Sequence, residues 1–499
     1  MNVIFATQGE YANFYLDLLG PLGEKISLDK IGFYVTHASN YAKYVQKARK
    51  TGLKIEFVKE WEITDIKGQT PDHDLLQNLE KDFGDIFLWN ALLADRRIYN
   101  GVLTKAKQDY APRFSHTQML CILQNAFTSI LRFFDEIKPD VVVGGFTPVT
   151  FGEYVFYLIA KPRGIKYLNL NPTKILNYVT FSEEIYREFP HVIRDYKQYL
   201  QSDCRDTFCE DSEDYIKNKS RKYEGIVLST PDFPWKNWLF SIVKWPFVVA
   251  KYYLSKKHLD NQTRGAHFDY FNKQIFNPTK DKAIRKMLPY TSVDELANSQ
   301  YAYYPLHVEP EIALSLFGRE YLNQIELVRN IARSLPVTWK LVVKDHPAGV
   351  GRRNVKYYRK LLEIPNVVLA DHYLESKTII ENAKMVFTVS GFSGFEAVLK
   401  GKPVITFGKV FYNMLPDTMV RNVLCLQKLS DVINDFLASY EYSPKEAVSL
   451  VAAIMRNSVR LDLYTQVLNK KGRIGGNAQV VEEQKNDFVG LLSKQLQIS

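Results

Sequence analysis

FTVSGFSGFEAVLKGKPVITFG, residues 387–408, contains a short apolar strand, a glycine turn, a helix and a second apolar strand. The first strand ends at Ser390 and Gly391, and Gly401 followed by Pro403 stops the helix before the second strand begins. A strand, a helix and a strand in this order are typical of a parallel β-α-β unit. The stretch therefore predicts an α/β fold around it.

The same alternation of strands and helices runs through both halves of the chain. In the first half we expect strands at 3–6, 32–36, 54–58, 141–145 and 167–170, and in the second at 301–305, 340–344, 367–369, 385–389, 404–407 and 423–426. Two successive α/β runs predict two facing Rossmann-like domains with a cleft between them. Ligands of such sheets bind beyond the carboxyl ends of the strands.

The domain boundaries follow from changes in this pattern. We expect an N-terminal Rossmann-like domain at 1–182, a largely helical insertion or linker at 183–295, a C-terminal Rossmann-like domain at 296–457, and a C-terminal helix with a loosely ordered tail at 458–499. The insertion is rich in Tyr, Lys, Asp and Trp and has weak strand signals. The tail is polar and poorly patterned, which favours loose order.

Composition narrows the class of protein and of partner. Of 499 residues 46% are hydrophobic and 24% are charged, which is typical of a globular chain. The four cysteines have no spacing that suggests a zinc site or a disulfide framework, and the N-terminus lacks a signal peptide, so we expect a cytoplasmic protein. A net charge of +10 favours anionic partners, but the chain has no motif that would indicate nucleic acid.

One basic, aromatic segment stands out, WKNWLFSIVKWPFVVAKYYLSKKH at 235–258. Lys244 and Pro246 interrupt its apolar run, so it does not predict a membrane-spanning helix. Its three tryptophans and flanking lysines suit a membrane interface, such as the inner face of the cytoplasmic membrane. A helix pair buried against another domain fits the same pattern equally well.

The turn in the opening stretch is a candidate phosphate site. A glycine-bearing turn before a helix exposes backbone N–H groups at the positive end of the helix dipole. Ser390, Gly391, Ser393 and Gly394 form this turn, and Ser393 and Glu396 have the spacing of a capping box. The carboxylate of Glu396 could instead accept hydrogen bonds from ribose. A well-capped helix without any ligand is the other interpretation.

A second candidate wall of the site is LVVKDHPAGVGRR, residues 341–353. Pro347 favours an extended His346, and a histidine at a strand end can contact a phosphate or protonate a leaving oxygen. Lys344 adds positive charge, whereas we expect Arg352 and Arg353 to be solvated.

Three further stretches carry polar residues after strands. His307 and Glu309, in YAYYPLHVEPEIAL at 301–314, could contact a base or a sugar, or belong to a rigid connector between domains. In the first domain, Glu10 and Glu153 each follow a strand and a glycine turn. Either could activate an acceptor hydroxyl, and either could be a helix-start acid that only favours the dipole.

The second half of the chain resembles the bacterial capsule polysaccharide biosynthesis family, which includes Kdo-transferring glycosyltransferases. The resemblance rests on five stretches taken together: YPLHVEPE, VKDHP…GRR…Y, PNVVLADH, TVSGFSGFEAVLKGKPVITFG and FY (411–412). The resemblance implies a metal-independent GT-B-like enzyme without a cofactor, in which 296–457 is the nucleotide-sugar-binding domain and 1–182 is the acceptor-side domain. It also implies that His346 and Pro347 contact the donor phosphate, that Ser390, Gly391 and Ser393 form the phosphate-binding helix start, and that Glu396 contacts the ribose.

The function expected from these residues is transfer of a sugar from a nucleotide-activated donor, CMP-Kdo-like or a UDP-sugar, to a glycan or lipid-linked acceptor. His346 is the leading catalytic candidate, with Glu153 or Glu10 as the base. A sugar-nucleotide epimerase of the same fold and a non-catalytic polysaccharide-assembly component are the alternatives.

Overall fold

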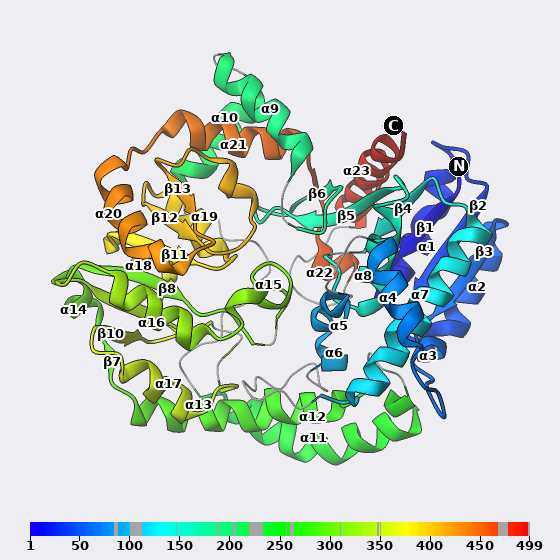
Figure 1. The fold of residues 1–499 in the computed structure, drawn as a ribbon, viewed down its shortest axis with the longest axis horizontal. Helices are drawn as coiled ribbons and strands as arrows, with labels where there is room; N and C mark the ends of the chain where they lie inside the picture. Colours follow the sequence, from blue (N-terminus) through cyan, green and yellow to red (C-terminus); the bar gives the residue numbers. More distant parts are fainter. Residues whose placement is uncertain are drawn as a thin grey trace.

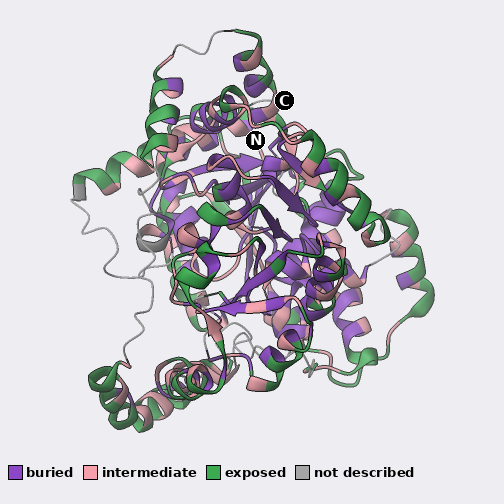
Figure 2. Cartoon of the chain, turned by 90° about the vertical axis from the view of Figure 1, so that its left-hand side faces the viewer, coloured by how far each residue is buried: buried purple, intermediate pink, exposed green. Residues whose placement is uncertain are grey.

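The computed structural model describes residues 1–83, 88–99, 112–145, 147–186, 189–202, 206–218, 233–255, 257–259, 264–309, 311–346, 349, 351–467 and 478–497. Two seven-stranded sheets, each flanked by helices, organise these residues (Figure 1). Figure 2 shows that the strands are buried, whereas the outer helices are largely exposed.

The N-terminal sheet is parallel except at one edge. Its order is β3 (Lys54–Lys59), β2 (Lys30–Val35), β1 (Val3–Ala6), β4 (Val141–Gly144) and β5 (Lys166–Pro172), followed by β6 (Tyr178–Ser182) and β14 (Val459–Arg460). Pairing is parallel from β3 to β5, while β6 is antiparallel to both β5 and β14. The order 3-2-1-4-5 is that of a Rossmann-like sheet, whose strand order reverses between β1 and β4.

The C-terminal sheet is parallel throughout. Its order is β7 (Tyr290–Thr291), β10 (Val367–Ala370), β9 (Lys340–Lys344), β8 (Tyr301–Pro305), β11 (Met385–Thr388), β12 (Val404–Thr406) and β13 (Val420–Asn422). Counted from β8, the six strands beyond β7 follow the Rossmann order 3-2-1-4-5-6, with the reversal between β8 and β11. The predicted α/β class with two Rossmann-like domains is confirmed.

Helices connect and cover these strands. In the first half they are α1 (Tyr11–Gly23), η1 (Ala38–Asn40), α2 (Tyr41–Thr51), α3 (Glu60–Ile63), α4 (His73–Asp82), α5 (Trp89–Ala94), α6 (Arg96–Tyr99), α7 (His116–Ile137) and α8 (Phe151–Ala160). The middle of the chain holds α9 (Pro190–Gln201), α10 (Thr207–Lys217), α11 (Trp235–Leu254), η2 (Lys257–Leu259), α12 (Ala266–Phe271), the π-helical η3 (Asn272–Phe276) and α13 (Asn277–Met287).

The remaining helices are α14 (Val293–Ala297), α15 (Ile312–Ser315), η4 (Arg319–Tyr321), α16 (Gln324–Ser334), α17 (Val355–Leu362), α18 (Ser376–Asn382), α19 (Phe392–Leu399), η6 (Phe411–Met414), η7 (Leu426–Lys428), α20 (Leu429–Ser439), α21 (Pro444–Arg456), α22 (Leu463–Gln466) and α23 (Ala478–Gln497).

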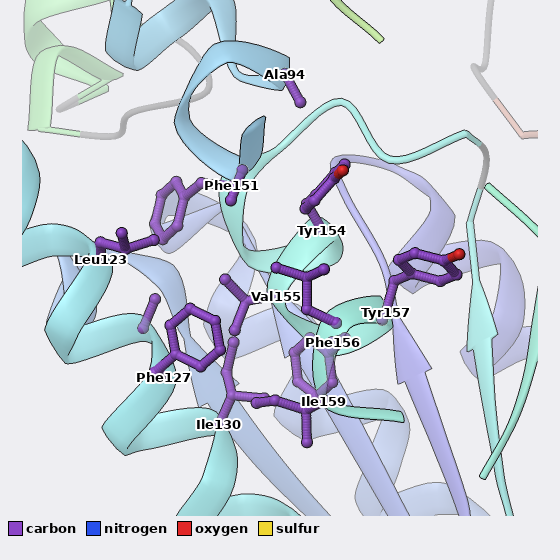
Figure 3. Packing of buried hydrophobic residues seen from close by; sticks show 14 of the residues in the cluster. Ala94, Leu123, Phe127, Ile130, Phe151, Tyr154, Val155, Phe156, Tyr157 and Ile159 are labelled. Carbon is purple, nitrogen blue, oxygen red and sulfur yellow. The ribbon is translucent and has the colours of Figure 1, made fainter. Parts of the chain in front are cut away.

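Helix α8, which connects β4 to β5, is the most deeply buried helix of the N-terminal core. Its apolar side chains pack against those of α7, including Leu123, Phe127 and Ile130 (Figure 3). Each of the ten α8 residues is buried. This burial is expected of a helix that is apolar on all sides, because every face must then be covered by protein. Both helices begin with a capping box, Ser115 with Gln118 in α7 and Thr150 with Glu153 in α8.

The C-terminal segment belongs to the N-terminal domain. β14 pairs with β6, and α23 packs on α1, with the rings of Phe488 and Phe14 5.3 Å apart. Phe488, Leu492 and Leu496 recur every four residues along α23, with Val489 next to Phe488, and all four are buried. The expectation of a loosely ordered tail is therefore wrong over 478–497, because the spacing of these apolar residues makes an amphipathic helix.

The segment between the sheets is helical over its described residues up to Met287. It attaches to the C-terminal domain at several places, among them the packing of α9 and α10 on α21, the ion pair of Arg285 with Asp371, and the pairing of β7 at 290–291 with β10. The C-terminal sheet thus begins before residue 296. Cys209 of α10 is disulfide-bonded, contrary to the expectation of unpaired cysteines, whereas Cys121 and Cys425 are free.

The carboxyl edges of the two sheets meet. Lys174, just after β5, places its Nζ 5.4 Å from the ring centre of Phe392, which follows β11. A second contact between the two domains places the Nζ of Lys409, after β12, 4.4 Å from the ring centre of Tyr186, which lies beyond the antiparallel strand β6. The residues beyond the strand ends of one domain therefore face those of the other.

Candidate functional site

The reversal point of the C-terminal sheet is closed by a buried histidine. His307, two residues beyond β8, places its Nε2 3.4 Å from both the backbone nitrogen of Ser390 and the Oγ1 of Thr388, at the end of β11. The amide of Gln324 fixes the backbone of His307 from both sides, accepting at 2.7 Å and donating at 3.0 Å. His307 is thus positioned to support the Ser-Gly turn from below.

The turn itself starts α19 one step earlier than the sequence suggests. Gly391 is the N-cap residue, and its N–H donates to Thr388 Oγ1 at 2.9 Å. The capping box predicted between Ser393 and Glu396 is therefore wrong, because Phe392 already opens the helix and Ser393 lies within its first turn. The hydroxyl of Ser390 donates to the carbonyl of Ala313 at 3.0 Å. The backbone of this turn, more than its hydroxyls, is what can meet a phosphate.

Gly394 serves close packing behind the turn. A Cβ at this position would lie 2.4 Å from the hydroxyl oxygen of Tyr412 and 2.8 Å from Thr388 Cγ2. The hydroxyl of Tyr412 donates to the carbonyl of Gly391 at 2.6 Å, which fixes the N-cap residue. A side chain at 394 would push Tyr412 away from Gly391.

Lys344 and Glu396 form the polar floor beside the turn. Lys344, the last residue of β9, is buried, and its Nζ donates to Ser376 Oγ at 3.3 Å. Desolvation lowers the pKa of Lys344, opposed by Asp345, Asp371 and Glu396. The Glu396 side chain is open to solvent, yet surrounding protein raises its pKa by desolvation, with Lys400 and Lys344 acting in the opposite direction.

His346 stands at the carboxyl end of β9 with its side chain exposed. Its backbone N–H donates to Asp345 Oδ1 at 2.7 Å. Desolvation by nearby protein lowers the pKa of His346, while Glu311 and Asp345 act to raise it. The imidazole is therefore neutral near pH 7 and offers one donor and one acceptor. Pro347 lies outside the described residues.

Arg353 corrects the expectation that both arginines of this loop are solvated. It is 3% exposed, forms an ion pair with Asp345 and lies 3.7 Å from a carboxylate oxygen of Glu309. It also donates to the carbonyl of His307. The buried guanidinium of Arg353 thus connects Asp345, at the end of β9, to the residues that follow β8.

Glu309 belongs to the same buried network. It accepts from Gln324 and from the hydroxyl of Tyr357, and burial raises its pKa in spite of Arg353. The structure therefore places the carboxylate of Glu309 in a buried network with Arg353, Gln324 and Tyr357. Arg352 is half-buried, and its carbonyl accepts from Lys280 Nζ at 3.2 Å.

The two N-terminal glutamates occupy different environments. Glu153 is fully buried, and its Oε2 accepts from the backbone N–H groups of Val149 and Thr150 at 3.2 and 3.1 Å. Burial raises the pKa of Glu153 to about 8. Glu10 is half-exposed at the end of β1 and accepts from the amides of Asn13 and Asn40 at 2.7 and 3.3 Å. Of the two, only Glu10 presents its carboxylate to solvent.

In the described part of the chain, no group of three or more His, Cys, Asp or Glu side chains is arranged to hold a metal ion.

The C-terminal site lies in a part of the chain that is similar to a known protein family. Residues 258–422 match the model of the family described as "Capsule polysaccharide biosynthesis protein". This range contains His307, Lys344, His346, the Ser-Gly turn and Glu396. The resemblance inferred from the sequence motifs is confirmed.

Individual relatives are distant. The capsule polysaccharide export protein KpsS of Escherichia coli is 26% identical over 156 residues, a match that covers 29% of this chain and 38% of that protein. The match thus spans less than two fifths of this relative's length.

The solved structures that the chain resembles are also distant. KpsC of Thermosulfurimonas dismutans, a beta Kdo 2,7 transferase, is 12% identical with a TM-score of 0.35, and the match covers 74% of this chain and 89% of that one. UDP-GlcNAc 2-epimerase of Neisseria meningitidis is 13% identical with a TM-score of 0.28, covering 91% and 98%. The fold assignment above rests on the strand order of this chain.

Proposed function

We propose that the chain is a glycosyltransferase of capsule or surface polysaccharide biosynthesis. It moves a sugar from a nucleotide-activated donor, CMP-Kdo-like or a UDP-sugar, to a glycan or lipid-linked acceptor. The observation that supports this proposal is that Lys344 and His346, at the end of β9, and the start of α19, after β11, lie at the same carboxyl edge of the C-terminal sheet, on either side of β8. All three lie within the range that matches the capsule family model.

The donor phosphate binds at the start of α19. Backbone N–H groups of the first turn and the positive end of the helix dipole meet the phosphate oxygens. His346 donates from the end of β9, which β8 separates from β11, and Lys344 supplies positive charge from the floor. Glu396 accepts from the ribose hydroxyls. As the bond between sugar and phosphate breaks, negative charge grows on the departing nucleotide, and these donors stabilise it there.

The acceptor is activated from the N-terminal domain. Glu10 removes the proton from the acceptor hydroxyl, whose oxygen attacks the anomeric carbon as the nucleotide leaves. In this scheme the nucleotide sugar is a substrate, and neither a metal ion nor a further cofactor takes part. The reaction takes place in the cytoplasm, at the inner face of the cytoplasmic membrane.

Two measurements test the proposal. In a thermal-shift series of CMP, UDP, GDP and dTDP, with and without magnesium, we expect stabilisation by one nucleotide without a requirement for the metal. The substitution His346→Ala should lower kcat/KM for transfer by about 10²–10³-fold, whereas Lys356→Ala, at an exposed position of α17, should leave it unchanged.

Three results would contradict the proposal. Near-normal transfer by a folded His346→Ala variant would remove the role of this residue. If NMR of the nucleotide sugar with the protein and no acceptor shows its conversion to an epimer, the chain would be an epimerase. A chain that no nucleotide stabilises would be a non-catalytic assembly component.

A further inference from the structure

Helix α11 has two apolar faces, and only one of them is covered. On the inner face, Trp238 Nε1 donates to the Ile275 carbonyl at 3.2 Å and to Thr279 Oγ1 at 3.1 Å. Farther along the same face, Trp245 packs on Phe271 with ring centres 5.1 Å apart, and Tyr252 is buried. These contacts join α11 to α12, η3 and α13, and the four form a helical arm over 235–287.

The outer face of α11 carries large apolar side chains in contact with solvent. The exposed side chains of α11 include Leu239 (60% exposed), Phe240 (64%), Val243 (64%), Phe247 (72%) and Leu254 (84%). Positions 239, 243, 247 and 254 follow one another at helical spacing and form one stripe. Figure 1 shows the arm along the foot of the molecule, and Figure 2 shows its outer surface as exposed.

The charge of the arm has one sign. Helix α11 contains no Asp or Glu, and Lys244 and Lys251 flank its apolar stripe. Residues 235–287 contain nine lysines and two arginines against three aspartates, a net charge of +8 within a chain of net charge +10. Most of the basic excess of the protein therefore belongs to the segment that contains α11.

We propose that the outer face of α11 docks on an anionic phospholipid bilayer, with the helix lying in the plane of the headgroups. Apolar and aromatic side chains between lysines are the composition of interfacial helices. In the described part of the chain, no helix is long and apolar enough to cross a membrane. A helix that lies on the surface needs no such length.

A second copy of the chain fits this face less well. Pairing two outer faces would bring two arms of net charge +8 together, without an acidic residue in either α11. An anionic bilayer supplies both an apolar layer for the stripe and negative charge for the lysines. Charge complementarity thus selects the lipid surface.

The arm also contacts the loop that follows His346. Lys280 of α13 donates to the carbonyl of Arg352, and a Cβ on Gly351 would lie 2.3 Å from the carbonyl oxygen of Asn277. A membrane-bound arm therefore lies next to the wall of the candidate donor site. Membrane docking would present a lipid-linked acceptor to the site and so deepens the proposed function. Only this role of the docking rests on the proposed function.

Vesicle co-sedimentation of the full chain tests the docking. We expect binding to vesicles of phosphatidylcholine mixed with phosphatidylglycerol, and much weaker binding to phosphatidylcholine alone. Reversing two charges with Lys244→Glu and Lys251→Glu should weaken binding at least about 25-fold, since each lysine near such a surface contributes about five-fold. The double substitution Val243→Asp and Phe247→Asp, which removes apolar side chains from the stripe, should abolish vesicle binding.

A matched control separates the face from hydrophobicity in general. Val337 and Leu424 are 99% and 78% exposed elsewhere on the molecule, and Val337→Asp with Leu424→Asp should leave vesicle binding unchanged. Equal binding to both kinds of vesicle, or undiminished binding by the α11 variants, would overturn the proposal. So would a lipid-free dimer that the α11 variants dissociate. Nucleotide-induced thermal shifts, measured in parallel, report on the proposed function independently.

Discussion

Arg353 shows how one residue of a basic loop can become part of the protein core. Its neighbours in sequence are glycine, arginine and asparagine, which are typical of a solvated turn. In the structure it is enclosed by Asp345, Glu309 and the carbonyl of His307. These partners come from two strand ends, so the guanidinium connects β8 to β9 directly beneath the candidate phosphate site.

Removing this cation should destabilise the protein strongly. Arg353→Ala leaves two buried carboxylates without their partner, for which we expect a loss of about 3–5 kcal/mol in the free energy of unfolding. Arg353→Lys should restore only part of it, because an ammonium cannot reproduce the guanidinium fork. Denaturant unfolding measures both. The control Arg352→Ala should cost less than about 1 kcal/mol, and equal costs for the two alanine variants would refute the assignment.

The two glutamates of the N-terminal domain should separate into a structural and a catalytic residue. We expect Glu10→Gln to lower kcat by about 10²–10⁴-fold, as loss of a general base does. Glu153→Gln should keep transfer within a few-fold of the wild type, because a glutamine can still accept the capping hydrogen bonds. Steady-state kinetics with a soluble acceptor distinguish them. A larger loss in Glu153→Gln than in Glu10→Gln would reverse the assignment.

Glu153 also makes stability depend on pH. Its pKa is about 8 in the folded protein and 4.5 in the unfolded chain, so folding binds a proton between these values. The stabilisation is complete below pH 4.5 and is lost as pH rises to 8, at about 1.4 kcal/mol per pKa unit. Compared with Glu153→Gln, the wild type should lose on the order of 5 kcal/mol across this window. Parallel pH profiles of the two proteins would contradict this prediction.

Sequence reasoning located the residues at strand ends better than those beneath them. Lys344, His346, Ser390 and Gly391 could be grouped because the carboxyl ends of parallel strands share one edge of a sheet. The burial of Glu309 depends on Gln324 of α16, and no local pattern links these two positions. The capping box at Ser393 failed for a related reason, since Thr388 of the preceding strand holds the N-cap residue.

Long strands with apolar runs were predictable from the sequence, whereas short strands at the edges of the sheets were not. The expected strands at 3–6, 301–305 and 340–344 match β1, β8 and β9 residue for residue. β7 and β14 have two residues each, too few to show a period. β13 lies at Val420–Asn422, before the expected 423–426, because it is fixed by pairing with β12.

The start of α19 depends on one close contact that substitution can test. Gly394→Ala would place a methyl group 2.4 Å from the Tyr412 hydroxyl oxygen, and we expect a cost of about 1–3 kcal/mol and weaker nucleotide binding. In the double variant with Tyr412→Phe the clashing oxygen is absent, so the two costs should be less than additive. Thermal unfolding of the four proteins measures this coupling. Strict additivity would show that the contact does not shape the turn.

At the scale of the whole molecule, the chain passes from one domain to the other twice. It leaves the N-terminal sheet after β6, enters the C-terminal domain through the helical arm, and returns at β14 to pair with β6. Two connections restrain relative motion of the domains more than one would. The return also makes the last helix, α23, part of the N-terminal core.

This return predicts that a change near the C-terminus will unfold the N-terminal domain. Phe488 is fully buried against Phe14 and Phe181, with ring centres 5.3 and 5.6 Å apart. Phe488→Ala should lower the free energy of unfolding by about 3–5 kcal/mol, a large part of the stability of a domain. Asn486→Ala, at an exposed position of the same helix, should have little effect.

The location of the loss can be measured as well as its size. If α23 completes the N-terminal core, hydrogen exchange in Phe488→Ala should accelerate in β1, β2 and α1 while the C-terminal sheet keeps its protection. Nucleotide should still stabilise the variant, because its proposed site lies entirely on the other sheet. Uniform acceleration in both sheets would mean instead that the two domains unfold as one cooperative unit, with the two chain crossings transmitting the loss.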